Sequence, residues 1–281
     1  MTDDVLTRRQ RLGRALPMRA MIPNAITLAA LCFGLTGVRL AIAGDWERAI
    51  AAVVLAGVLD GIDGQIARLL KGASRFGAEL DSLSDLTAHG VAPALILYLW
   101  SLQYLPGAGW LIALSLAACA ALRLARFNTG IDLEAGPHKQ AGFLTGVPAP
   151  VGAGLALSPM ALDLWLDTQF FRQPVVTGAI VAGAALLMVS ALPTYSWKKV
   201  RIRREWRIFA LLAVALYAGA LFSAPWMTLS LTIVAYAASI PFSVLAYGKV
   251  KRQRRAAAAG SQSVPQSEPA PARTEPEPPS V

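Results

Sequence analysis

Residues 60–85 read DGIDGQIARLLKGASRFGAELDSLSD, and this stretch places four aspartates inside strongly apolar sequence. The four acids are Asp60, Asp63, Asp81 and Asp85. A single carboxylate at membrane depth costs about 2.5–3.5 kcal/mol on insertion scales. Four of them on two neighbouring segments therefore need a cationic partner, and hard oxygen ligands suit Mg²⁺, Mn²⁺ or Ca²⁺.

The composition is typical of a membrane protein. Of the 281 residues, 55% are hydrophobic and 15% are charged, whereas about 25% of the residues in a soluble domain are charged. Long apolar runs meet the requirement of about 20 residues for a helix that crosses a bilayer. We predict an all-α, polytopic membrane bundle of eight transmembrane helices. Their predicted ranges are 22–43, 47–70, 78–104, 108–126, 148–166, 174–192, 207–224 and 227–248.

The net charge of +9 is distributed as in a membrane protein rather than a nucleic-acid-binding protein. Lys and Arg cluster at 8–19, 71–75, 198–207 and 249–255. Of these two residue types, the loops 44–47, 105–107, 167–173 and 225–226 carry only Arg172, whereas Lys139 lies in the loop 127–147 on the same side as the clusters. The positive-inside rule then predicts an integral protein of the cytoplasmic (inner) membrane with both termini in the cytoplasm. The basic clusters either favour anionic lipid head groups or only set this topology.

The chain divides into three parts. Residues 1–21 are predicted to form a basic cytoplasmic segment, and residues 22–248 the transmembrane domain that carries the acids. Residues 249–281 are predicted to form a disordered cytoplasmic tail, because residues 256–281 are rich in Ala, Pro, Ser, Gln and Glu. Cys32 and Cys119 both fall within predicted spans and imply no disulfide framework.

The spacing of the acids predicts a single layer of carboxylates. Asp60 and Asp63 are three residues apart and Asp81 and Asp85 are four apart, so each pair shares one helix face. The predicted topology places both pairs in the cytoplasmic halves of consecutive helices, roughly 12 Å from the helix ends. A short connection favours adjacent packing of these two helices.

Small residues and one arginine accompany the acids. Gly64 follows the first aspartate by one helical turn, and Gly77 precedes the third by one turn. With Ala67 they leave room for a bulky ligand, although close helix packing explains the glycines equally well. Arg68 adds a cation whose geometry matches phosphate. The set predicts a metal-assisted site for a phosphorylated substrate, facing the cytoplasm.

Three other interpretations explain less. An interhelical polar network, with Arg68 paired to an aspartate, accounts for one or two of the acids but not for four. A cation transporter predicts acids spread across the bilayer depth, whereas these lie in one layer beside an arginine. A non-catalytic lipid-binding protein would not need four ligating carboxylates.

The same residues carry a resemblance to the CDP-alcohol phosphotransferase family, whose signature is D-x2-D-G-x2-A-R-x8-G-x3-D-x3-D. The matching residues are Asp60, Asp63, Gly64, Ala67, Arg68, Gly77, Asp81 and Asp85. Members transfer a substituted phosphate from a CDP-linked lipid or alcohol to a hydroxyl and release CMP. The resemblance implies that the four aspartates hold two divalent ions, Mg²⁺ or Mn²⁺, with Asp85 as general base. It assigns CDP binding to Asp63, Gly64, Arg68 and Gly77.

Further segments resemble one branch of this family. Pro23-Asn24-Ala-Ile-Thr27 is similar to the family's opening helix and adds Asn24 to the CDP-binding candidates. Residues 122–128 (LRLARFN) and 142–150 (GFLTGVPAP) resemble the bacterial and archaeal phosphatidylserine synthases. This resemblance implies CDP-diacylglycerol and L-serine as substrates, and a homodimer. Inositol, glycerol phosphate and choline are the alternative acceptors.

Two features next to the signature concern the acceptor and the base. Arg123 and Arg126 share a helix face and are followed by Asn128, so we expect them to bind the serine carboxylate or the substrate phosphate. Alternatively, the arginines only set the topology. His89 stands where the family pattern predicts an aromatic residue such as Phe, four residues after Asp85. It either tunes that base, binds substrate or packs beside the site.

Overall fold

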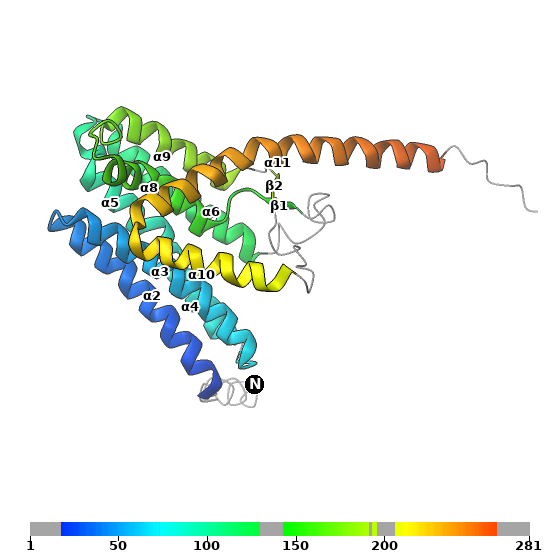
Figure 1. Ribbon diagram of the computed structural model, residues 1–281, viewed down its shortest axis with the longest axis horizontal. Coiled ribbons are helices and arrows are strands. Elements are labelled where there is room, and N and C mark those ends of the chain that lie inside the picture. The colour runs from blue at the N-terminus through cyan, green and yellow to red at the C-terminus, as the bar shows by residue number, and fades with distance from the viewer. Residues whose placement is uncertain (1–17, 73, 130–142, 191–192, 196–205, 263–281) are drawn as a thin grey trace, which may run out of the picture.

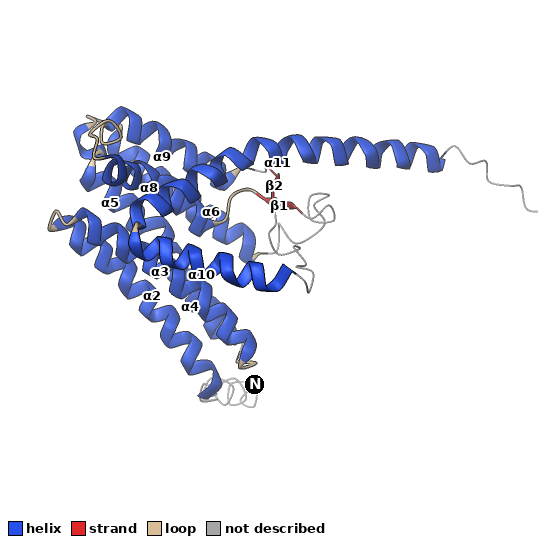
Figure 2. Ribbon diagram, viewed as in Figure 1, coloured by secondary structure: helices blue, strands red, loops and turns tan. Residues whose placement is uncertain are grey.

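The fold is almost entirely helical, as Figure 2 shows. The computed structural model describes residues 18–72, 74–129, 143–190, 193–195 and 206–262. Most of the predicted basic N-terminal segment, most of the loop before the fifth span and the end of the predicted tail lie outside the described residues.

Each of the eight predicted spans is occupied by helix. The first four correspond to α2 (Met18–Ile42), α3 (Trp46–Leu69), a segment that begins with α4 (Arg75–Leu86), and α6 (Gly109–Asn128). The last four correspond to α8 (Ala149–Leu166), α9 (Pro174–Val189), α10 (Arg207–Ser223) and α11 (Pro225–Gln262). Five helices of the described chain are long and apolar enough to cross a membrane. The predicted helical membrane bundle is thereby confirmed.

The third predicted span, 78–104, is not one regular helix. α4 passes through a π-helical turn, η1 (Thr87–Val91), into α5 (Ala92–Trp100), and a short 3-10 turn, η2 (Leu102–Tyr104), follows. Pro93 has no backbone N–H to donate, and the N–H of Ala92 bonds to the Thr87 carbonyl five residues back. The irregular turn therefore begins two residues after Asp85, and π turns occur frequently at functional sites.

The second and third segments pack against α2. Figure 1 shows α2 beside α3 and α4, and α2 also contacts η1 and α5. Small residues allow this approach: a Cβ at Gly34 of α2 would lie 2.9 Å from the Ala88 Cα in η1. Elsewhere α9 packs on α6 and α8, α11 packs on α8, and α10 lies against α11. The carboxylate-bearing segments α3 and α4 are thus fixed by a common neighbour.

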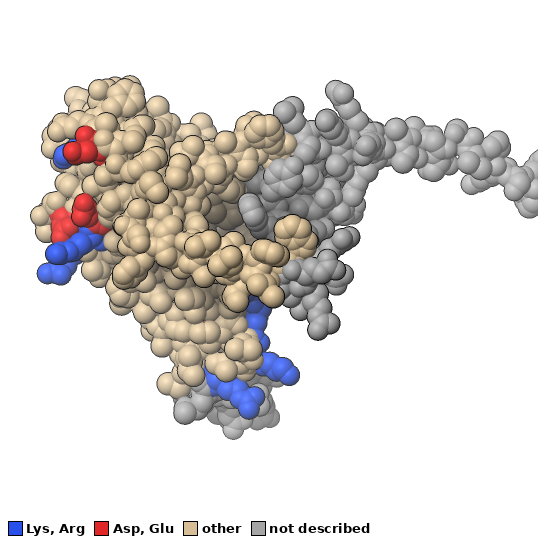
Figure 3. All heavy atoms as spheres, viewed as in Figure 1, with Lys and Arg blue, Asp and Glu red and all other residues tan. Residues whose placement is uncertain are grey.

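The connections gather at two ends of the bundle. At one end, Arg172 donates to the Trp100 carbonyl (3.4 Å) and its guanidinium lies 5.9 Å from the Trp46 ring centre. The opposite end holds the start of α2, the α3–α4 connection and the end of α6. On the face drawn in Figure 3, acidic and basic side chains lie together at the first end, and basic ones lie at the second.

Two features at the second end differ from the predicted spans. β1 (Phe143–Thr145) and β2 (Pro193–Tyr195) form an antiparallel pair, two strands of three residues each that were not predicted. α11 continues to Gln262, so the prediction of disorder from residue 249 is wrong for 249–262 (Figure 1). Lys, Arg, Gln and Ala are good helix formers, and the first proline beyond them is Pro265.

Candidate active site

α3 and α4 bring the four predicted aspartates together. Oxygen atoms of Asp60, Asp63 and Asp81 all lie within 4.8 Å of one another. Ligand atoms of Asp60, Asp85 and His89 lie within the same distance of one another. Asp60 belongs to both groups, so the structure contains two overlapping candidate cation positions that share one carboxylate.

The acids differ in their exposure and have little counter-charge. Asp63 is 2% exposed, Asp60 and Asp85 are partly buried, and Asp81 is exposed. In the described part of the chain, no Lys or Arg forms a salt bridge with any of the four, Arg68 included. One oxygen of Asp63, Oδ1, is buried without a hydrogen-bond partner. These carboxylates therefore fit one or more divalent cations, and the pairing of Arg68 with an aspartate is absent from the described structure.

Helix α2 braces both acid-bearing helices through two hydroxyls that the sequence-based site did not include. The Thr27 hydroxyl donates to Asp63 Oδ2 at 2.5 Å and also lies 3.0 Å from the Pro23 carbonyl. The Ser84 hydroxyl of α4 donates to the Thr27 carbonyl at 3.0 Å. Both residues are polar side chains in apolar segments: Thr27 ends the segment 23–27, and Ser84 lies between Asp81 and Asp85. That position in the sequence could have predicted a role for them at the site.

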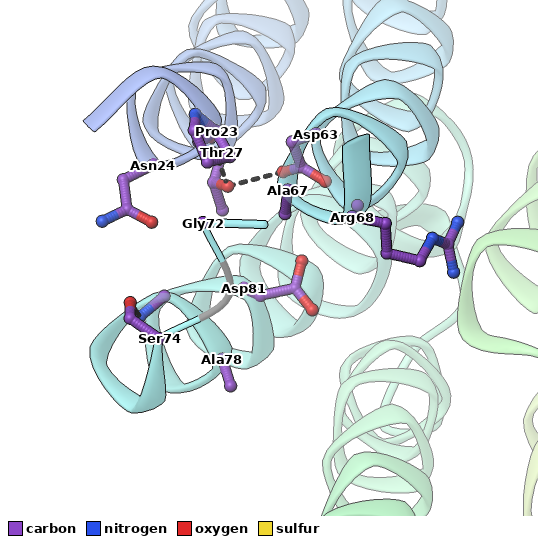
Figure 4. A pocket seen from close by; sticks show the side chains of 12 residues that line it. Pro23, Asn24, Thr27, Asp63, Ala67, Arg68, Gly72, Ser74, Ala78 and Asp81 are labelled. Carbon is purple, nitrogen blue, oxygen red and sulfur yellow. Dashed lines mark hydrogen bonds between the residues drawn. The ribbon is translucent and has the colours of Figure 1, made fainter. Parts of the chain in front are cut away.

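A cavity of about 240 Å³ opens beside Asp63 and Asp81. Figure 4 shows that α2, α3 and the start of α4 contribute its walls. It is lined by Pro23, Asn24, Thr27, Asp63, Gly64, Ala67, Arg68, Gly72, Ser74, Gly77, Ala78 and Asp81. The buried Nδ2 of Asn24 has no hydrogen-bond partner. Two residues that line the cavity, Asn24 on α2 and Asp63 on α3, thus each have a buried polar atom without a partner.

The two glycines of the site have different roles in the structure. A Cβ at Gly64 would meet nothing within 4 Å, so this glycine leaves open space rather than packing a helix. A Cβ at Gly77 would lie 2.8 Å from Asn24 Oδ1, and the Gly77 N–H donates to the N-cap hydroxyl of Ser74 at 3.0 Å. Gly64 therefore leaves space open at the cavity, and Gly77 lets α4 approach Asn24 closely.

Arg68 lines the cavity but is exposed. Its guanidinium extends away from Asn24 and Ser74 in Figure 4. The long side chain can thus reach a phosphate outside the narrow part of the cavity, since no ion pair in the described chain holds it.

The predicted acceptor-binding residues lie at the end of α6, where they also join neighbouring helices. Nη1 of Arg123 donates to the Met188 carbonyl at 3.3 Å, and Nη1 of Arg126 donates to the Val189 carbonyl at 2.8 Å. The last carbonyls of α9 have no partner within their helix, so these bonds cap it. Asn128 Nδ2 donates to Ser82 Oγ of α4 at 2.9 Å, next to Asp81.

Comparison with known proteins shows the family to which the chain belongs. A family model described as CDP-alcohol phosphatidyltransferase matches residues 20–189, a range that includes every site residue named in this subsection. A second model, CDP-alcohol phosphatidyltransferase 2, matches residues 205–241. The chain belongs to the CDP-alcohol phosphatidyltransferase family.

Curated relatives with one common name cover most of the chain. A protein of Mycobacterium leprae is 34% identical over 85% of this chain and 79% of its own length. A protein of Helicobacter pylori is 30% identical over 77% of this chain and 87% of its own length. A protein of Bacillus subtilis is 32% identical over 63% of this chain and 92% of its own length. All three are named CDP-diacylglycerol–serine O-phosphatidyltransferase.

Proposed function

We propose that this protein transfers the phosphatidyl group of CDP-diacylglycerol to the hydroxyl of L-serine, giving phosphatidylserine and CMP. The observation that carries the proposal is the convergence of four carboxylates from α3 and α4 beside an open cavity, within the family's complete residue pattern. The common name of the relatives supports serine as the acceptor.

The four aspartates are the proposed ligands of divalent ions. Two ions, Mg²⁺ or Mn²⁺, would occupy the two overlapping groups, with the Asp60 carboxylate shared between them. When bound, such ions supply a positive clamp for pyrophosphate oxygens and for charge that develops in transfer. Thr27 would hold Asp63 in position through its 2.5 Å hydrogen bond, because a ligand fixed by a neighbour keeps its orientation.

The cavity between α2, α3 and α4 is the proposed site for the cytidine diphosphate. Asn24 would donate from its unpaired Nδ2, and Asp63 would accept at its unpaired Oδ1. Gly64 would let the nucleotide approach the backbone of α3, and Gly77 would contribute by keeping α4 close to Asn24 at the cavity wall. Arg68 would reach the diphosphate, since a guanidinium pairs well with phosphate oxygens.

Asp85 is the proposed general base. It would take the proton of the serine hydroxyl, whose oxygen forms a bond to the phosphorus that carries diacylglycerol. The bond between that phosphorus and the bridging oxygen breaks, and CMP leaves with the electron pair. Positioning of the two substrates and electrostatic stabilisation would provide most of the rate gain.

Arg123, Arg126 and Asn128 are the proposed contacts for the serine carboxylate or the transferred phosphate. Each guanidinium has five N–H donors, so a bond to an α9 carbonyl is compatible with a further bond to an anion. The hydrogen bond from Asn128 to Ser82 supports this placement, because it connects the end of α6 to the helix of Asp81 and Asp85.

The membrane arrangement follows from the proposed chemistry. The CDP head group of the lipid and L-serine would both reach the site from the cytoplasm. The carboxylate end of the bundle and both termini would therefore face the cytoplasm at the inner membrane, as the positive-inside rule predicts. Residues 22–248 would form the catalytic domain, between the basic segment 1–21 and the tail from 249. A homodimer is proposed from the family resemblance, with no nucleic-acid partner.

Release of CMP by the purified full-length protein tests the proposal. The protein receives CDP-diacylglycerol, Mn²⁺ or Mg²⁺, and L-serine, inositol, glycerol phosphate or choline in turn. We expect CMP release and phosphatidylserine only with L-serine. Release with another acceptor would support the transferase activity but contradict serine as the acceptor. A folded protein that is inactive with all four acceptors would contradict the proposed activity.

A further inference from the structure

His89 is buried at the centre of the site although it is not one of the signature residues. It lies in the π turn η1 and is 2% exposed. A Cβ at Gly57 of α3 would lie 3.3 Å from His89 Nε2, and the next residue in the π turn, Gly90, packs so closely on α6 that a Cβ there would lie 2.9 Å from Ala120 Cβ. The imidazole is therefore held in one place by close packing of η1 against α3 and α6.

The two ring nitrogens of His89 differ in their partners. Nδ1 lies 2.9 Å from Asp85 Oδ1, whereas Nε2 is buried without a hydrogen-bond partner. Leaving a buried polar atom unpaired costs about 1–3 kcal/mol. A residue that only filled this space would avoid that cost as an apolar ring, so packing alone does not explain an imidazole here.

The surroundings of the ring supply the missing role. An imidazole nitrogen of His89 lies within 4.8 Å of ligand oxygens of both Asp60 and Asp85. At metal–ligand distances of about 2.0–2.1 Å, neighbouring ligand atoms of one octahedral cation lie about 2.9 Å apart. The 2.9 Å between Nδ1 and Asp85 Oδ1 fits two such neighbours, so Nδ1 is the nitrogen placed to share a cation with the carboxylates.

We propose that His89 is a nitrogen ligand of a divalent cation held together with Asp60 and Asp85. This inference rests on the metal site of the proposed function but not on the identity of the acceptor. Imidazole suits transition metals, whereas Mg²⁺ prefers oxygen ligands. One of the two cation positions is thereby biased away from Mg²⁺ and toward a transition metal, and the other, formed by Asp60, Asp63 and Asp81, has oxygen ligands only.

The test is electron spin echo envelope modulation of Mn²⁺ bound to the full-length protein without substrate. We expect a ¹⁴N coupling from a directly bound imidazole, replaced by a ¹⁵N pattern when the protein is made with ¹⁵N-histidine. His89→Phe should remove the coupling and weaken Mn²⁺ binding by about 10–100-fold, with a smaller change for Mg²⁺ in competition. His138→Phe is the matched control, because it removes the other histidine of the chain.

The outcomes separate this inference from the proposed function. Mn²⁺ bound with no nitrogen coupling, or a coupling lost in His138→Phe and kept in His89→Phe, would overturn the role of His89 and leave the carboxylate site intact. A folded protein that binds no Mn²⁺ would overturn both. The ¹⁵N-labelled wild-type protein gives a result even if His89→Phe does not fold.

Discussion

Two groups of charged side chains lie at the same end of the bundle and differ in how their polar atoms are satisfied. Around the aspartates of α3 and α4, three buried polar atoms lack hydrogen-bond partners within the described structure: Asn24 Nδ2, Asp63 Oδ1 and His89 Nε2. At the end of α6, Arg123 and Arg126 instead donate to the last carbonyls of α9. The first group is arranged to bind something else, and the second also holds helices together.

This difference predicts different consequences of substitution. Loss of a side chain at the carboxylate site should affect metal binding, nucleotide binding or turnover, with little effect on folding. Loss of an arginine at the end of α6 should affect both the stability and the KM for serine, because the side chain that bonds to α9 is also the proposed contact for the acceptor. The substitutions below test this contrast, beginning with the largest expected effect.

Asp85→Asn should reduce transfer to serine by about 10²–10⁴-fold, the usual contribution of a general base. The amide cannot accept the serine proton, although it keeps the shape of the side chain. Initial rates of CMP release measure the effect. Asp167→Asn is the control. Asp167 follows the last residue of α8, away from the carboxylate site, and has a left-handed conformation that Asn tolerates. Substantial activity in folded Asp85→Asn would exclude its role as base.

Gly64→Ala should raise the KM for CDP-diacylglycerol by about 10-fold or more, as one added carbon in a binding pocket commonly does. The new methyl group enters open space at the cavity and should not disturb folding. Gly61→Ala, on the same helix and equally unhindered but outside the cavity lining, should leave KM unchanged. Equal effects of the two substitutions would show that the cavity does not bind the nucleotide.

Thr27→Val should weaken Mn²⁺ binding by about 10-fold, the lower range for loss of a residue that orients a metal ligand. Valine keeps the volume of the side chain but removes the hydrogen bond to Asp63. Titration with Mn²⁺ measures the change. Thr36→Val, which removes only a bond to the Cys32 carbonyl within α2, should bind Mn²⁺ as the wild type does. Unaltered affinity in Thr27→Val would contradict the bracing role of α2.

Arg126→Lys should raise the KM for serine several-fold and lower the free energy of unfolding by about 1 kcal/mol, the usual value of one hydrogen bond. Lysine keeps the charge but loses the fork that bonds both Val189 and an anion. Steady-state kinetics and thermal unfolding together separate the two roles. Arg48→Lys, at the opposite end, should change neither. Reduced stability with unchanged serine kinetics would leave the capping role alone.

The sequence predicted the helices and the carboxylate cluster because both depend on short-range patterns. Apolar runs of about 20 residues define the spans, and i,i+3 and i,i+4 spacing on two connected helices places four acids together. Asn24, which lines the cavity, could also be chosen as a candidate from the sequence, because the segment 23–27 resembles the opening helix of the family.

Other features were not predictable because they depend on partners distant in the sequence. The Val189 carbonyl that Arg126 caps is 63 residues away, and Thr27 reaches Asp63 across 36 residues. The π turn after Asp85 is followed by Pro93 and packs against α3 and α6, which are distant in the sequence. Hydropathy alone therefore predicts one continuous helix over 78–104.

The number of Mn²⁺ ions bound per chain tests the shared carboxylate centre most directly. Asp60 belongs to both candidate groups, whereas Asp81 belongs to one. Equilibrium binding to the full-length protein should find two ions in the wild type, one in Asp81→Asn, and neither at comparable affinity in Asp60→Asn. Wild-type stoichiometry and affinity in folded Asp60→Asn would contradict the account.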